Sequence, residues 1–400
     1  MHSINFIQEA ENIKETLIKY RRDFHRNPEL GFEENRTSAV IKEFLENEGI
    51  EYLETAGTGV CAIIRGKGTR TIAIRADMDA LPIQDAKNCD YSSKAEGKMH
   101  ACGHDAHTAI LLGTAKILNK IKDDIKGNVK LFFEPAEETT GGAQLMIKDG
   151  VLENPYVEAV IGLHVDENIQ VGKIGIKKGV VNAASNPFTI KIKGKGGHGA
   201  RPEDAVDPVV IASSVVMNLQ TIVSRELTPT EPSVLTIGTI HGGTAQNIIP
   251  EEVTISGIIR TMTSEHREYV KRRLVEIVEG ITHSLRGTSE IEIVESYPCL
   301  YNEDKMMELL KYSAEEQLGS NNIKILDKPS LGVESFAYFS KERPSVFYFL
   351  GCRNDKKGII HPAHGNKFDI DEDCLPIGVA VHCAAAFNYL NIAFQDRGSI

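Results

Sequence analysis

The first part of the chain alternates helical and extended hydrophobic patterns. Apolar residues recur at helical spacing over Ile7–Asn27, and Pro28 then ends the predicted helix. Short runs of apolar and β-branched residues follow, separated by turn residues and by further amphipathic segments. The expected strands are Val60–Arg65, Thr71–Ala76, Val129–Glu134 and Ala159–His164, and the expected helices are Arg36–Glu48, His104–Lys120 and Gly142–Lys148. This alternation predicts an α/β layer with a central, mostly parallel sheet flanked by helices.

Near Ala183 the pattern changes. The expected strands are Pro187–Lys193, Ser233–Ile240, Glu252–Arg260 and Glu290–Glu295. One helix, Asp207–Arg225, follows the first strand, and a second helix, Ser264–Leu285, follows the third. Ser264 is the expected N-cap of the second helix. The order β-α-β-β-α-β is that of the ferredoxin-like α+β unit.

After Tyr297 and Pro298 the first pattern returns. Helices are expected at Lys305–Gln317 and Leu375–Leu390, with a buried strand at Ser345–Leu350. We therefore predict one discontinuous α/β domain, formed by residues 1–183 and 299–400, and a ferredoxin-like domain inserted at residues 184–298.

Length and composition agree with this division. The 400 residues exceed one ordinary core, and the net charge of -11 argues against a broad nucleic-acid surface. No apolar run approaches the ~18 residues of a membrane-spanning helix, and the N-terminus lacks the apolar core of a signal peptide. Seven cysteines without a CxxC pair are typical of reduced thiols. We therefore expect a cytoplasmic protein that binds neither nucleic acid nor a membrane.

Residues that can bind metals gather in four segments. Residues 99–107 contain three histidines, Cys102 and an aspartate, and thiolate and imidazole are preferred ligands of zinc-like ions. Glu137 and Glu138 follow a buried strand, at the end where open α/β sheets place their sites. His164 ends the next strand. Together these segments predict a metal centre.

The fourth segment is a loop rich in Gly and Pro that carries His361 and His364, and the loop by itself does not decide which of them binds a metal. The four segments together fit a two-metal hydrolytic centre. In such centres a nearby carboxylate takes the proton of the water that attacks a carbonyl group.

The inserted domain contains candidates for substrate binding. The glycine-dense loop at residues 193–202 could present His198 to a developing oxyanion. Asn247 lies in a second Gly-rich turn and Arg260 ends the following strand, and an Arg with an Asn could bind a carboxylate. The sequence contains no Walker-type phosphate loop, no dinucleotide fingerprint and no GxSxG elbow.

These motifs, in this order, resemble the M20 family of metallopeptidases and amidohydrolases, in the branch of hippurate hydrolases, N-acyl-amino-acid amidohydrolases and auxin-conjugate hydrolases. The resemblance covers nearly the whole chain. The segments that carry it are His25 with Pro28–Glu34, Arg75–Pro82, the Cys102 cluster, Pro135–Glu138, Gly162–His164, Gly196–His198, Asn247–Pro250 with Arg260, and Lys367–Glu372.

The resemblance implies a catalytic α/β domain with an inserted lid that dimerises, and a site that holds two divalent ions. Zn²⁺ or Mn²⁺ is expected, with Co²⁺ and Ni²⁺ as further options. The implied ligands are Cys102 between the ions, His104 and His164 on one ion, and Glu138 and His364 on the other. Glu137 would be the general base and then the acid that protonates the leaving amine.

The same resemblance implies roles for the lid residues. His198, from the lid of a partner subunit, would stabilise the oxyanion, and Asn247 with Arg260 would bind the substrate carboxylate. A homodimer or homotetramer through the lid follows. The expected reaction is hydrolysis of the amide bond of N-acyl-L-amino acids such as acetyl or benzoyl derivatives.

The closing loop departs from the family pattern. Relatives in this branch often carry a proline two residues after the last histidine ligand, where this chain has Asn366. His361 therefore competes with His364, although the spacing of His364 to Phe368 fits better. Asp77 and Asp79 are expected to support ligands or structure rather than to bind metal.

Two alternatives to this activity are a dipeptidase or carboxypeptidase with the same chemistry, and a non-catalytic metal-binding protein on this fold. The second alternative predicts the loss of a catalytic group, whereas all the candidate ligands and Glu137 are present.

Overall fold

The computed structural model describes residues 4–139 and 141–391. The chain forms two compact units. Unit 1 comprises Met1–Val181, Tyr301–Lys328 and Glu334–Ile400, and unit 2 comprises Asn182–Leu300 and Pro329–Val333. Both main boundaries lie within two residues of the predicted ones, but the short segment Pro329–Val333 joins unit 2. The amide of Ala183 donates to the carbonyl groups of Ser330 and Gly332, which ties this segment there.

Unit 1 contains an eight-stranded sheet in the order β1-β2-β4-β3-β5-β16-β6-β15. The central strands β4, β3, β5 and β16 are parallel to their neighbours among these four, whereas β1, β2 and the β16–β6 pair are antiparallel. The bounds are β1 Glu51–Thr55, β2 Gly59–Arg65, β3 Thr71–Asp77, β4 Asn128–Glu134, β5 Ala159–Gln170, β6 Ile174–Ile176, β15 Ile323–Ile325 and β16 Ser345–Arg353. The predicted α/β class is therefore confirmed.

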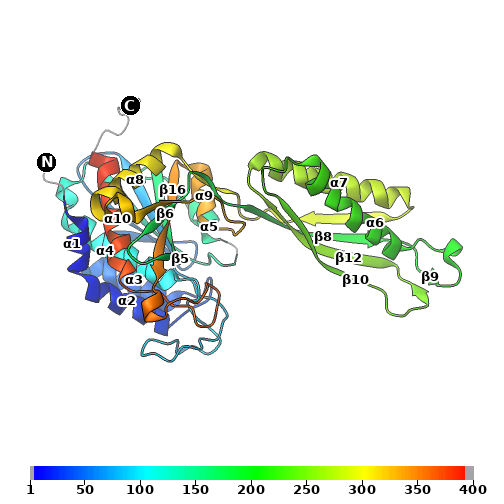
Figure 1. The fold of residues 1–400 in the computed structure, drawn as a ribbon, viewed down its shortest axis with the longest axis horizontal. Coiled ribbons are helices and arrows are strands. Elements are labelled where there is room, and N and C mark those ends of the chain that lie inside the picture. Colours follow the sequence, from blue (N-terminus) through cyan, green and yellow to red (C-terminus); the bar gives the residue numbers. More distant parts are fainter. Residues whose placement is uncertain (1–3, 140, 392–400) are drawn as a thin grey trace. The chain divides into compact units, whose positions relative to one another are not determined.

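Helices lie on both sides of this sheet (Figure 1). They are α1 Phe6–Glu11, α2 Lys14–Arg26, α3 Asn35–Asn47, α4 His104–Lys120, α5 Gly142–Lys148, α8 Asp304–Leu318, α9 Phe336–Glu342 and α10 Cys374–Asn391. Helices α4 and α10 are buried along almost their whole length, because apolar residues occupy all their faces. They form the centre of the core, and α4 places its first residue, His104, at the candidate site.

The prediction of one helix over Ile7–Asn27 is wrong. The helix breaks at Asn12 and Ile13, where the backbone of Ile13 (φ -109°, ψ 9°) is not helical. The break lets α1 pack against α10 while α2 packs against α4. The periodicity of the apolar residues continues across the break, so sequence alone did not reveal it.

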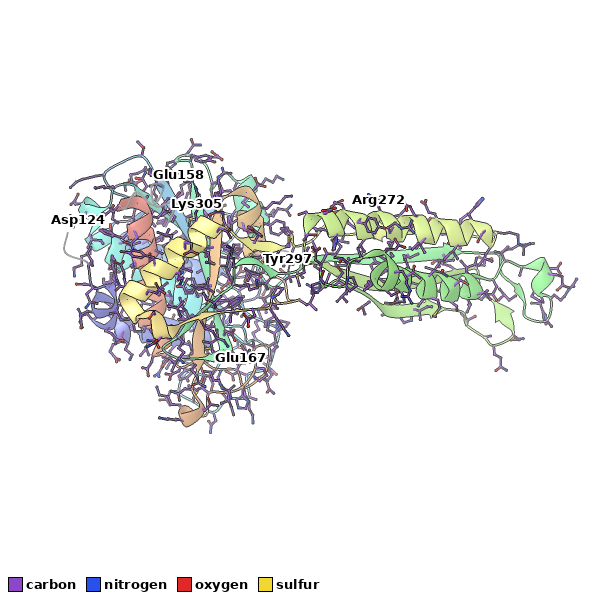
Figure 2. All side chains as sticks on the ribbon, turned by 45° about the horizontal axis from the view of Figure 1, so that its top comes forward. Asp124, Glu158, Glu167, Arg272, Tyr297 and Lys305 are labelled. Carbon is purple, nitrogen blue, oxygen red and sulfur yellow. The ribbon has the colours of Figure 1, made fainter. Side chains whose placement is uncertain are left out.

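Unit 2 has the predicted β-α-β-β-α-β order. Its elements are β8 Ala184–Lys193, α6 Pro208–Thr221, β10 Val234–Gly242, β12 Glu252–Thr261, α7 Ser264–Ser284 and β13 Thr288–Ile293, and the antiparallel sheet has the order β10-β12-β8-β13. Helices α6 and α7 cover one face of this sheet (Figure 1). On the outer side of α7, Arg272 points away from the sheet (Figure 2).

Two details of unit 2 differ from expectation. The N-cap of α7 is Thr263 and not Ser264, because the Thr263 side chain accepts a hydrogen bond from the amide of His266 at 3.2 Å. Helix α6 ends at Thr221, and a wider helical turn at Ile222–Glu226 follows it. Two short strands, β9 (Gly197–His198) and β11 (Ile248–Ile249), also pair with each other.

Within the described residues, α10 is the one helix long and apolar enough to span a membrane. Of its 18 residues, 78% are buried inside the structure, as expected for a helix at the centre of a folded core.

Candidate metal centre

The five predicted metal ligands lie together in unit 1. One ligand atom each from Cys102, His104 and His164 falls within 4.8 Å of the others, and the same holds for Cys102, Glu138 and His364. Cys102 belongs to both groups, which is the position that a bridging ligand requires. His361 belongs to no such group among the described residues.

The sheet explains this convergence. Strand β4 ends at Glu134, three residues before Glu137, and the neighbouring strand β3 ends at Asp77. Strand β5 carries His164, and α4 begins at His104. The carboxyl ends of parallel strands meet at one edge of a sheet, so the loops that leave them share one place.

Short contacts tie the ligands to one another. His164 Nε2 lies 3.3 Å from Cys102 Sγ, and His364 Nε2 lies 3.2 Å from Glu138 Oε1. His104 Nε2 lies 3.9 Å from the same Glu138 oxygen. The candidate ligand atoms therefore lie within 4 Å of one another in these three pairs.

Local backbone geometry aims these side chains. Gly103 has a φ of +92°, and a Cβ atom there would lie 2.4 Å from Val165 Cγ2, so only glycine fits between Cys102 and His104. Ala136 and His364 adopt positive φ values of 55° and 61° without being glycine. Such positions cost about 1–3 kcal/mol each and tend to cluster at functional sites.

The loop that carries His364 is held by two hydrogen bonds. The amide of His364 donates to the carbonyl of Ala101 at 2.8 Å, beside Cys102. The amide of Ala363 donates to Glu167 Oε1 at 3.2 Å, and Glu167 comes from the end of β5 (Figure 2). The loop is therefore anchored to two of the segments that carry the other ligands.

Asp79 supports two of the ligands from behind. Its Oδ1 lies 3.1 Å from His104 Nδ1, and its Oδ2 accepts a hydrogen bond from the amide of Glu138 at 3.0 Å. Because a carboxylate only accepts, Nδ1 of His104 carries a proton, and in the neutral imidazole that a metal ion would bind, Nε2 keeps its lone pair. Nε2 is buried and has no hydrogen-bond partner. A histidine held by a carboxylate on one nitrogen and unpaired on the other is typical of a metal ligand, so the residues present fit a bound cation.

His107 is a different case, although Asp77, His104 and His107 also lie close together. Nδ1 of His107 lies 2.6 Å from Asp77 Oδ1, and its Nε2 accepts from the amide of Val165 at 3.0 Å. Both ring nitrogens are therefore occupied. Asp77 in turn accepts from Arg75 Nη1 at 2.7 Å. We interpret Asp77 and His107 as framework behind the ligands.

The centre is rich in acidic groups. Burial raises the pKa of Glu137 well above its ordinary value, and the charges of Glu334 and Glu138 raise it further. Burial also raises the pKa of the Cys102 thiol, with a contribution from Glu138. Burial opposes the charge of Glu138, but the hydrogen bond from His364 and the charge of His104 outweigh it and lower the pKa of Glu138 to about 2. Cations at this site would relieve the repulsion and favour the thiolate.

The other predicted site residues belong to unit 2. His198 and Asn247 line a surface hollow of about 800 Å³ together with the glycines of both loops. Arg260 lies at the opposite end of β12, eight residues after Glu252, or about 26 Å at the rise of a strand. Asn247 and Arg260 of one chain are therefore not brought together.

Two buried residues that sequence reasoning missed also reach the centre. The amide of Ser335 donates to Glu137 Oε1 at 2.9 Å, and the neighbouring Glu334 is 4% exposed. Both stand at the start of α9, which the hydrophobic pattern did not predict. In the sequence, Glu334 and Ser335 do not stand at a recognisable spacing from the candidate ligands, so no motif marks them as part of the site.

Comparison with known proteins identifies the family. The model of Peptidase family M20/M25/M40 matches residues 73–388. Thermostable carboxypeptidase 2 of Saccharolobus solfataricus is 39% identical over 390 residues, which are 96% of this chain and 98% of that protein. N-acetyl-L-cysteine deacetylase of Bacillus subtilis is 40% identical over 366 residues, covering 91% of this chain and 85% of that protein.

A solved structure agrees with these matches. The crystal structure of a Bacillus subtilis protein described as a dinuclear metal-binding peptidase of the M20 family has a TM-score of 0.82 and 33% identity, over 95% of this chain and 99% of that one. The resemblance seen in the sequence motifs is thus confirmed. The chain belongs to peptidase family M20/M25/M40 and is a hydrolase of amide bonds.

Proposed function

We propose that this protein hydrolyses the amide bond of N-acyl-L-amino acids with two bound divalent ions, Zn²⁺ or Mn²⁺ in the first place. The observation that carries the proposal is the convergence of Cys102, His104, Glu138, His164 and His364 around shared points, with Glu137 beside them. The deacetylase relative acts on an N-acetyl amino acid by its name, which supports the substrate class.

Each residue has a distinct task in this proposal. A pair of divalent ions supplies Lewis acidity, which polarises the amide carbonyl and lowers the pKa of water. Glu137 takes the proton of the attacking water and passes it to the nitrogen of the leaving amino acid. The raised proton affinity of Glu137 suits a group that must hold this proton between the two steps. Cys102, His104, Glu138, His164 and His364 hold the ions.

Arg260 suits recognition of the amino-acid carboxylate. Its Nη1 is buried and has no hydrogen-bond partner within the described residues, and burial lowers the pKa of Arg260. A buried guanidinium nitrogen without a partner is costly, and a substrate carboxylate would satisfy it. A carboxypeptidase would need the same recognition, and the relative from Saccharolobus solfataricus bears that name, so this is the second candidate function.

A substrate panel separates the two functions. We expect N-acetyl and N-benzoyl amino acids to be hydrolysed with a higher kcat/KM than dipeptides with a free amine. Amidation of the substrate carboxylate should lower kcat/KM about 10- to 100-fold, because one charge-assisted pair is lost. Arg260→Met should lower kcat/KM by the same factor for the substrate with a free carboxylate and change it little for the amidated substrate. Preference for free dipeptides would instead identify a peptidase.

We further propose that the protein forms a homodimer through unit 2, with His198 and Asn247 completing the site of the partner. His198 is exposed and lies in β9, which pairs with β11 just before the start of β12, whereas Arg260 lies at the other end of β12. Strand β10 is an edge strand that exposes Ile240, and α6 exposes Val209, Val210 and Met217, the last at 70%. Exposed apolar residues beside an unpaired strand edge are typical of an interface.

A mixed dimer tests this arrangement. His198→Ala should lower kcat about 10²- to 10³-fold by loss of an oxyanion donor. Co-expression of His198→Ala with Glu137→Gln should restore about half of the wild-type activity, because the intact Glu137 then meets the intact His198 of its partner. The purified heterodimer, carrying two different tags, is assayed beside both parents. A heterodimer no more active than its parents would contradict the shared site.

A further inference from the structure

The candidate base Glu137 is held by a residue outside the motifs that mark the centre. The backbone amide of Ser335 donates to Glu137 Oε1 at 2.9 Å. Ser335 is fully buried, and Glu137 is 7% exposed. A hydrogen bond in this setting restricts the carboxylate to one orientation, because little water is available to compete with it.

The hydroxyl of Ser335 anchors the amide in turn. It donates to Glu134 Oε1 at 2.6 Å and accepts from Arg75 Nη2 at 2.8 Å. With one bond donated and one accepted to charged groups, the hydroxyl has a single favourable orientation. Glu134 ends β4, so Ser335 is fixed to the same strand from which the loop of Glu137 leaves.

Glu334 fixes the segment from the other side. Its Oε1 lies 3.1 Å from Arg75 Nη2 and accepts from the amide of Phe336 at 3.0 Å. Residue 334 is also where the chain re-enters unit 1 after Pro329–Val333. The two residues directly before α9, Glu334 and Ser335, are therefore both held by the buried Arg75.

Arg75 joins the base to the ligand framework. Its Nε donates to Glu134 Oε2 at 2.6 Å and its Nη1 to Asp77 Oδ2 at 2.7 Å. Asp77 Oδ2 lies 3.7 Å from His104 Nε2. One fully buried guanidinium group thus fixes both the segment that orients Glu137 and a carboxylate beside a candidate ligand.

We propose that Ser335 is a positioning residue for the reaction: its amide aims Glu137 at the water, and its hydroxyl, held between Glu134 and Arg75, keeps that amide in place. The inference rests on the proposed function of Glu137. Ser335 touches neither substrate nor metal in this assignment, and it acts through Glu137 alone.

Ser335→Ala removes the hydroxyl and keeps the amide. We expect kcat to fall about 10- to 100-fold because the Glu137 carboxylate is no longer held in one orientation, and we expect KM to change less than about threefold. The metal content of the purified enzyme should stay equal to that of the wild type. Ser313→Ala is the matched control, since Ser313 is also fully buried in unit 1 with one bond donated and one accepted, away from the centre. It should leave kcat unchanged.

The decisive measurement repeats Ser335→Ala in a Glu137→Gln background. A residue that acts through Glu137 has nothing left to position there, so we expect less than about a twofold further change in kcat. A merely structural residue would lower the residual rate by the same factor as before. Should Ser335→Ala fail to fold, Glu334→Gln provides a milder disturbance of the same segment and is expected to follow the same pattern.

The outcomes separate the inference from the proposed function. Full activity of Ser335→Ala, a loss explained by missing metal, or an equal loss in both backgrounds would overturn the role of Ser335. If Glu137→Gln itself keeps substantial activity, the assignment of the base fails instead.

Discussion

Glu137→Gln is expected to lower kcat by about 10²- to 10⁴-fold while both metal ions stay bound. Glutamine has nearly the same shape and can still accept the hydrogen bond from the amide of Ser335, 2.9 Å away in the native protein. It cannot take a proton from water, and so it removes one chemical step without disturbing the fold. Turnover of an N-acetyl amino acid and metal content by elemental analysis measure the two effects.

Two controls make this result specific. Glu158→Gln changes a glutamate at the amino end of β5, remote from the centre, and should leave kcat near the wild-type value (Figure 2). Glu138→Gln changes the neighbouring carboxylate, and because Glu138 is assigned to a metal it should lower metal content as well as kcat. Retention of substantial turnover by Glu137→Gln would contradict the assignment of Glu137 as the general base.

Removal of the metals is expected to abolish turnover. A chelator should lower activity by roughly 10³-fold or more, since the Lewis-acid contribution amounts to several kcal/mol. Zn²⁺, Mn²⁺, Co²⁺ or Ni²⁺ added back should restore it to different extents. Because the ions bind only the folded site, they should also raise the thermal unfolding temperature, which gives a readout independent of activity.

Cys102→Ala tests the metal centre from inside the chain. Cys102 is the one residue common to the two main groups of candidate ligands, so its loss should lower metal content below that of the wild type. Activity should fall as far as it does under chelation and should not return with added metal. Cys61→Ala removes another buried thiol of unit 1 and should change neither quantity. A Cys102→Ala protein with full metal content would contradict a bridging thiolate.

Much of the fold could be predicted because it depends on local patterns. The alternation of helices and short strands indicates a parallel layer, and the switch to β-α-β-β-α-β near Ala183 indicates an inserted unit. Cys102, His104, Glu138 and His164 could be located for the same reason, since each lies close to the end of a predicted strand or the start of a predicted helix, and the family resemblance implied their role as ligands. His364 lies in a loop, and its choice over His361 rested on the resemblance and on its spacing to Phe368. The break at Asn12 could not be predicted, because the apolar period continues across it, and the hydrophobic pattern did not predict the short helix α9.

What the sequence by itself determined is thus the metal centre as a set of residue types in four loops. The tertiary structure decided which of them meet. It brings His364 rather than His361 beside Glu138, and it occupies both nitrogens of His107. It also supplies Ser335 from a segment 198 residues away in the chain to hold Glu137. These outcomes depend on which strands are neighbours in the sheet and on which residues hydrogen-bond to the buried Arg75. Such contacts join residues far apart in the chain, so they produce no periodic pattern in the sequence.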